Sequence, residues 1–161
     1  MDRRVALLGV VLVAAFSLAG SAAVEGFLQV TINEVELNPV GRDAGKEWVE
    51  LLNISDEDID LAGWMLTYNY RSDGLIMIAE TELLLRPGER HIFTYPELML
   101  RNDDNTVIEL LSPDGIVVDR TPTMNDEAGD GQTWQRYPDG GDPLFLDFWI
   151  LGDGTKNAPN E

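Results

Sequence analysis

Apolar and polar residues alternate along most of the chain, and this spacing is typical of β-strands rather than helices. Leu28, Val30 and Ile32 would share one face of a first strand, whereas Val35 takes the opposite phase. We therefore predict a β-bulge near Asn33, because one extra residue in a strand shifts the side chains that follow to the other face. No stretch after residue 27 has the i, i+3, i+4, i+7 spacing of an amphipathic helix.

Turn signals divide the rest of the chain into short strands. Residues 46–53 predict a second strand with apolar residues on both faces, which indicates a strand covered on both sides or one near a folded sheet edge. Ser72-Asp73-Gly74, Arg86-Pro87-Gly88 and Ser112-Pro113-Asp114-Gly115 each predict a tight turn, with glycine supplying a positive φ. A last strand is expected over residues 133–137, before an end rich in proline and glycine.

This pattern predicts an all-β fold. Turn signals at this spacing over about 110 residues are typical of an antiparallel β-sandwich. The 161 residues are enough for one such domain, and no repeat or linker divides them. We expect the domain to cover residues 27–160.

The first 23 residues resemble an export signal. Arg3 and Arg4 precede an uncharged stretch over residues 5–24, and the small residues Ser21-Ala22-Ala23 form a cleavage site after Ala23. The alternative is an uncleaved N-terminal anchor, which would be the only membrane contact we expect. Both interpretations predict a secreted or cell-envelope protein.

Composition narrows the classes of partner and chemistry. The formal net charge is −18, which argues against nucleic acid as a partner because phosphate binding needs a basic surface. The sequence has no cysteine and only one histidine, His91, so disulfides, thiolate metal sites and multi-histidine metal sites are excluded. No serine lies in a Gly-x-Ser-x-Gly motif, and His91 fits a strand. We therefore expect no catalytic residues and no enzyme.

Several motifs, taken in order, resemble the lamin tail domain family, in its exported prokaryotic form. They are INEV at residues 32–35, EWVELLN at 47–53, IDLAGWML at 59–66, LRPGE at 85–89, the strand–Asp-Gly–strand unit at 107–119, TWQR at 133–136 and the terminus at 155–160. The resemblance implies an immunoglobulin-like β-sandwich that binds or anchors. The chain has neither the heptad rod nor the terminal cysteine of nuclear lamins.

Eight residues match the positions of the family motifs, and we interpret them as structural. They are Glu34, Trp48, Glu50, Asn53, Gly63, Trp64, Trp134 and Arg136. We expect the two glutamates to accept hydrogen bonds from loop N–H groups, Asn53 to close a turn, and the tryptophans to pack in the core. The alternatives are a binding surface or cation site for the polar residues and a ligand groove for the tryptophans.

Two further motifs concern metal and sugar. Asp56-Glu57-Asp58-Ile59-Asp60 opens like a calcium loop, but Leu61 and Thr67 stand where an EF-hand needs glycine and glutamate. A less regular calcium site could use one of two acidic loops, which contain Asp56, Asp58 and Asp60 or Asp126, Glu127 and Asp130. Calcium is thus the one cofactor left open. Asn53-Ile54-Ser55 is an N-glycosylation sequon.

These observations favour an exported, non-enzymatic binding module that acts at or outside the cell envelope through loops at one end. Its partner would be a protein or a surface polymer. Two alternatives remain at this stage: a small secreted hydrolase that uses acidic residues, and a calcium-stabilised structural component of the envelope.

Overall fold

The computed structural model describes residues 29–68, 73–95, 97, 100–102, 105–141 and 149–160. The predicted signal segment 1–23, Leu28 and Ser72 lie outside the described residues. The described part of the chain contains eleven strands and no helix, so the all-β prediction is confirmed. Accordingly, no helix in the described residues is long and apolar enough to cross a membrane.

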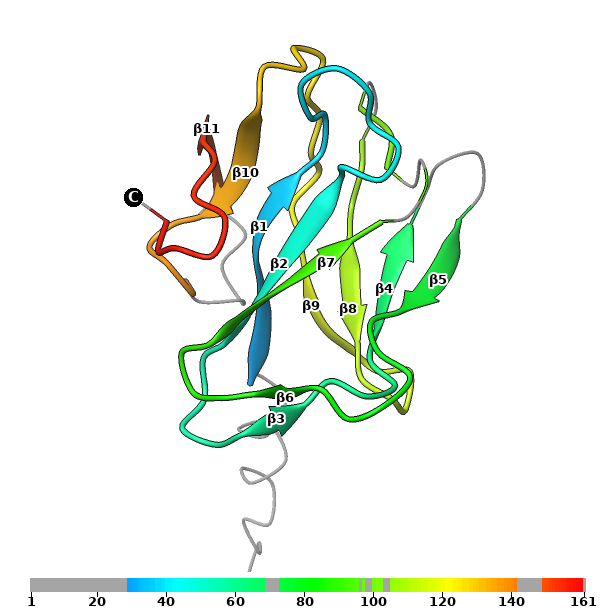
Figure 1. Cartoon of the computed structure of the whole chain (residues 1–161), viewed down its shortest axis with the longest axis vertical. Coiled ribbons are helices and arrows are strands. Elements are labelled where there is room, and N and C mark those ends of the chain that lie inside the picture. The colour runs from blue at the N-terminus through cyan, green and yellow to red at the C-terminus, as the bar shows by residue number, and fades with distance from the viewer. Residues whose placement is uncertain are drawn as a thin grey trace, which may run out of the picture.

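Two sheets form the layers of a sandwich (Figure 1). The five-stranded sheet has the order β11 (Trp149–Asp153), β10 (Gln132–Arg136), β1 (Val30–Glu36), β2 (Trp48–Asn53) and β7 (Arg90–Thr94). The four-stranded sheet has the order β5 (Gly74–Met77), β4 (Met65–Tyr68), β8 (Glu109–Leu111) and β9 (Val117–Arg120). The short strands β3 (Ile59–Asp60) and β6 (Leu84–Leu85) pair at one end of the sandwich. All these strand pairs are antiparallel.

The hydrophobic core lies between the two sheets. Strands β1 and β2 contribute Ile32, Val35 and Leu51, and the four-stranded sheet contributes Leu66 and Leu110, all fully buried. Side chains alternate between the faces of a strand, so the neighbours of these residues point to the outer faces of the sandwich. The two outer faces differ in chemistry: the five-stranded sheet carries buried glutamates there, and the four-stranded sheet carries apolar side chains.

The predicted β-bulge is present. The pairing of β1 with β2 shifts between Ile32 and Glu34, which keeps both Ile32 and Val35 in the core. The shift also places Glu34 directly opposite Glu50 in the adjacent strand. Two like charges at such a position destabilise a sheet unless other groups compensate them.

Two of the three predicted turns form as expected. Gly88 and Gly115 have φ of 73° and 77°, and the N–H of Gly115 donates to the carbonyl of Ser112 at 2.9 Å. The prediction at Asp73-Gly74 is wrong in detail, because Gly74 lies in β5 and does not have a positive φ. Its missing side chain serves a different need: a Cβ there would lie 2.4 Å from the ring of Tyr68, its partner across the strands.

Two strands were not predicted from the sequence, the two-residue β3 and the longer β11. β11 lies in the end that was expected to be irregular, and it pairs with β10 over its whole length. Trp149 at its start is buried in the core, with its ring centroid 4.9 Å from the Arg136 guanidinium carbon. After β11, residues 154–160, hereafter the C-terminal segment, turn back along the five-stranded sheet near β1 and β10 (Figure 1).

Candidate binding surface

The opposed carboxylates of Glu34 and Glu50 are fully buried beneath the C-terminal segment. Glu34 Oε1 accepts hydrogen bonds from the N–H of Thr155 at 2.7 Å and from Thr133 Oγ1 at 2.6 Å. Glu50 Oε2 accepts the N–H of Asn157 at 2.7 Å. Loop N–H groups thus compensate the two charges, as expected for a structural role.

Polar side chains extend this buried network around Glu50. Its Oε1 accepts Asn33 Nδ2 at 2.9 Å and lies 3.2 Å from Arg90 Nε. Arg90 also forms an ion pair with Asp139. Burial acts to raise the pKa of Asp139, but the hydrogen bond from Arg90 and the charge of Arg90 help to hold this pKa below the usual range. Burial raises the pKa of Glu50, and the hydrogen bonds from Asn33 and Asn157 oppose that rise. Both carboxylates of the motif are enclosed and bonded, so neither is presented to a substrate.

Arg136 connects the two layers of the sandwich. Its side chain is fully buried, and its Nη2 lies 2.7 Å from Asp119 Oδ2 on β9. The same oxygen accepts hydrogen bonds from Thr31 Oγ1 and from the N–H of Ile32, both at 2.7 Å. A buried ion pair needs such additional donors to compensate for its lost hydration.

Asn53 closes the turn after β2. Its Oδ1 accepts the N–H and the hydroxyl of Ser55, and its Nδ2 donates to the carbonyls of Glu57 and Leu85, both at 2.7 Å. The side chain is fully buried and both amide hydrogens are engaged. Asn53 therefore has the turn-closing position in the folded domain, and glycosylation at its sequon stays a prediction.

The tryptophans of the motif do not line a common groove. Trp64 and Trp134 pack against the core cluster, and Trp134 Nε1 donates to the carbonyl of Asn125 at 3.0 Å. Trp48 instead lies on the outer face of the five-stranded sheet, buried next to the C-terminal segment, with Lys156 Nζ 4.8 Å from its ring centroid. Gly63 has a φ of 77° before the start of β4, a conformation that favours glycine.

The two acidic loops that the sequence left as alternatives for calcium form no cluster of three acidic side chains in the described part of the chain. Within the described residues, no three acidic or histidine side chains come together as a metal-binding group. Asp56, Asp58 and Asp60 are exposed, and Asp60 Oδ1 accepts the N–H groups of Ala62 and Leu83, which lower the pKa of Asp60. In the second loop, Glu127 and Asp130 are also exposed, whereas Asp126 is buried.

The outer face of the four-stranded sheet carries an apolar row that crosses all four strands. Met77 pairs with Met65, Met65 with Leu111, and Leu111 with Val117. Their sequence neighbours Leu66, Ile76 and Leu110 pack in the core, so the four residues of the apolar row point outward. Met77 and Val117, at the two ends of the row, are 48% and 46% exposed, whereas Met65 is half-buried and Leu111 is only 8% exposed between them. Leu75, which is 51% exposed, follows on the same face as Met77. Apolar side chains that adjoin one another on an outer sheet face, with exposed members at both ends, are a feature of interaction sites, whereas single exposed apolar residues are ordinary.

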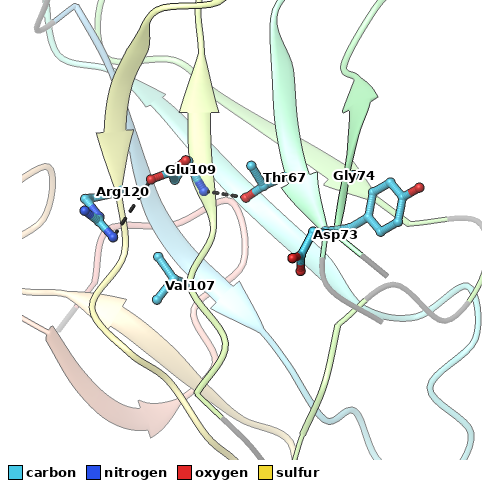
Figure 2. Close-up of a pocket in the computed structure, with 7 residues that line it drawn as sticks. Thr67, Asp73, Gly74, Val107, Glu109 and Arg120 are labelled. Carbon is cyan, nitrogen blue, oxygen red and sulfur yellow. Dashed lines mark hydrogen bonds and ion pairs between the residues drawn. The ribbon is translucent and has the colours of Figure 1, made fainter. Parts of the chain in front are cut away.

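A polar depression of about 260 Å³ borders the apolar row (Figure 2). Thr67, Glu109 and Arg120 project into it from β4, β8 and β9. The N–H of Glu109 donates to Thr67 Oγ1 at 2.8 Å, and Arg120 Nη2 lies 3.9 Å from Glu109 Oε1. This volume is below that of most small-molecule sites and suits a side chain of a partner protein better.

A second depression of about 490 Å³ lies between β11 and the C-terminal segment. Its polar side chains include Gln135 and Thr155, and both already donate to the Glu34 carboxylate. The apolar row and its polar depression are therefore the better candidate surface. The sequence alone does not predict this surface, because its residues have the spacing of ordinary strand residues. Only the strand pairing shows that they are neighbours.

Comparisons with known proteins agree with the fold. The model of the lamin tail domain family matches residues 24–124, which is more than half of the chain. A search of curated proteins finds no match.

Proposed function

The chain belongs to the lamin tail domain family, an immunoglobulin-like and non-enzymatic family, and on that premise we propose that it binds a partner protein through the apolar row. The observation that carries this proposal is the continuity of Met77, Met65, Leu111 and Val117 across the outer face of one sheet. With neighbouring strands about 4.8 Å apart, these four residues span about 14 Å. That length fits the apolar centre of a small protein interface.

The net charge supports one kind of partner over another. The net charge of −18 disfavours a second copy of the chain, because two copies would bring like charges together. Acidic groups also border the apolar row: Asp73 and Glu109 line the adjacent depression. The proposed partner is therefore a protein with an apolar patch rimmed by lysine or arginine.

The buried network supports the same proposal. Glu34, Glu50 and Asn53 are each hydrogen-bonded inside the domain, to Thr155, Asn157 and Leu85 among others. The family motif thus accounts for the stability of the scaffold and leaves its sheet face and loops for binding.

We further propose that the module is exported and acts at or outside the cell envelope. The support is the basic, apolar and small-residue pattern of residues 1–23. The intact mass of the native protein should show loss of these residues. Their retention in detergent-extracted membranes would instead establish an N-terminal anchor.

The docking surface can be tested by site-specific photocross-linking in cells. A benzophenone amino acid at Met77 or Val117 should capture one defined partner, whereas the same group at Ile150 on the other sheet should not. Ile150 is a matched control because it is a strand residue with a similar exposure of 42%. Equal capture at all three positions, or capture at Ile150 alone, would contradict the proposed surface.

A further inference from the structure

Two buried carboxylates, one on the last residue of β1 and one in the loop between β9 and β10, each have an oxygen without a hydrogen-bond partner among the described residues. These oxygens are Glu36 Oε1 and Asp126 Oδ2. Glu36 is 7% exposed and Asp126 is 4% exposed. A buried acceptor without a donor or a cation costs free energy, and a buried charge costs more.

Asn38 links the two carboxylates. Its N–H donates to the Glu36 carboxylate, and its Nδ2 donates to the carbonyl of Asp126 at 2.9 Å. The N–H of Asp126 in turn donates to the carbonyl of Asn102 at 2.9 Å. A hydrogen-bonded chain therefore runs from Glu36 through Asn38 and Asp126 to Asn102.

Asn102 contributes a third oxygen of the same kind. Its Nδ2 donates to Asp43 Oδ2 at 2.9 Å, and its Oδ1 is buried without a partner in the described part of the chain. The three oxygens on Glu36, Asn102 and Asp126 are alike in chemistry. Each is an acceptor, none carries a donor when the carboxylates are ionised, and two carry negative charge.

The electrostatics of Glu36 show how poorly its charge is compensated. Burial raises the pKa of Glu36 from 4.5 to about 7, the Asn38 N–H opposes this rise, and the charges of Asp126 and Glu34 increase it. Lys156 is the cation that acts on Glu36, and its effect is the smallest of these. Its Nζ lies over the ring of Trp48, which is the partner of Glu36 across the strands.

From this geometry we infer that Glu36 and Asp126 are the anionic ligands of a divalent-cation site suited to calcium, with Asn102 Oδ1 as a neutral ligand. Calcium binds carboxylate and amide oxygens in irregular loops, and water completes its coordination. The site lies beyond β1 and is separate from the apolar row. It also differs from the two acidic loops considered from sequence, because it takes only Asp126 from them and draws its other ligands from distant parts of the chain.

Terbium luminescence tests this site directly in the chain without residues 1–23. Trp134 binds the carbonyl of Asn125 beside Asp126, and Trp48 pairs with Glu36, so tryptophan excitation should sensitise a bound Tb³⁺ ion. We expect a saturable signal that Ca²⁺ displaces. In Glu36→Gln and in Asp126→Asn, Tb³⁺ binding should weaken at least tenfold.

The matched controls are Glu127→Gln and Asp130→Asn, which remove exposed charges from the loop that holds Asp126. They should leave Tb³⁺ binding within about twofold of the wild type. Circular dichroism would verify that each variant is folded, and where a variant is not, saturable binding of Tb³⁺ to the wild type and its displacement by Ca²⁺ still test the site. Absence of a saturable signal, or equal losses in the control variants, would overturn the site.

Discussion

At the scale of single residues, Glu36 should make stability depend on pH when divalent cations are absent. Its pKa is about 7 in the folded chain and near 4.5 in the unfolded chain, so the folded chain binds the proton more tightly. Its contribution to the free energy of unfolding is therefore fully present below pH 4.5 and is lost as the pH rises to 7. A shift of this size corresponds to on the order of 3 kcal/mol.

Urea unfolding of the wild type and of Glu36→Gln, in EDTA from pH 4.5 to 8, measures this contribution. Glutamine keeps the shape of the side chain without its titration, so the stability difference between the two proteins should follow the titration of Glu36. Parallel pH profiles for the two proteins would show that Glu36 does not titrate in this range.

Asp119 is the residue whose loss should be most damaging. Asp119→Ala leaves the Arg136 guanidinium buried without its carboxylate, and it also removes the acceptor of Thr31 and of the Ile32 N–H. The free energy of unfolding should fall by about 3–5 kcal/mol. The exposed control Glu82→Ala should change it by less than about 0.5 kcal/mol. A loss below about 1 kcal/mol for Asp119→Ala in urea unfolding would contradict the structural role of this pair.

Residue roles differ in how far a sequence can predict them. Asn53 and the glutamates of the motif were predictable as hydrogen-bonding groups because a polar residue within an apolar strand needs a partner. The partners themselves were not predictable, since Thr155 lies more than a hundred residues from Glu34 and only the fold brings them together. The same holds for Trp48, whose ring contacts the Lys156 ammonium of the C-terminal segment and does not lie in the core cluster between the sheets.

At the scale of elements, the C-terminal segment should be essential to the five-stranded sheet. Deletion of residues 154–161 removes the N–H donors to Glu34 and Glu50 and leaves two carboxylates opposed across the strands. We expect the free energy of unfolding to fall by at least about 3 kcal/mol, because hydrogen bonds to charged groups contribute about 1.5–3 kcal/mol each.

Thr155→Val provides the graded comparison for this deletion. It removes the hydroxyl that donates to Glu34 Oε2 at 2.9 Å but keeps the N–H groups of the segment. Its cost should be about 1.5 kcal/mol in the same urea measurement, the lower end of the range for one hydrogen bond to a charged group. If the deletion proved no more costly than this single substitution, the C-terminal segment would not compensate the two carboxylates.

Strands were predicted best where turn chemistry bounded them. The turns at Gly88 and Gly115 and the bulge in β1 all follow from local rules, and the structure has all three. β11 was not predicted because no recognisable turn motif connects it to β10 at the spacing of the other turns. Its pairing with β10 is set by tertiary contacts. Gly74 was assigned to a turn because the sequence alone does not distinguish a glycine that leaves room for the Tyr68 ring from a glycine that needs a positive φ.

At the scale of the whole molecule, net charge should limit stability at low salt. The chain without residues 1–23 carries 28 acidic and 9 basic side chains, because the removed part contains Asp2, Arg3 and Arg4. A domain of this size has a radius of gyration of about 14 Å, comparable with the screening length of about 10 Å at 0.1 M salt. The unfolded chain spreads these charges apart, so repulsion penalises the folded state more.

Raising NaCl from 0.1 to 1 M should therefore increase the free energy of unfolding by several kcal/mol, on the order of what charge screening at these distances provides. Urea is the suitable denaturant because it is uncharged, and EDTA keeps divalent cations from neutralising the chain. A urea midpoint that does not change with salt would mean that local pairing already offsets the repulsion.

The central claim is that the apolar row on the four-stranded sheet binds a partner protein, and an affinity measurement tests it most directly. The cross-linked partner, once purified, can be titrated against the wild type, Met77→Lys and the matched variant Ile150→Lys. Met77→Lys should weaken binding at least tenfold, because it places a charge in the desolvated centre of the interface and faces a basic rim. Ile150→Lys should bind like the wild type. Equal affinities for the wild type and Met77→Lys would contradict the account.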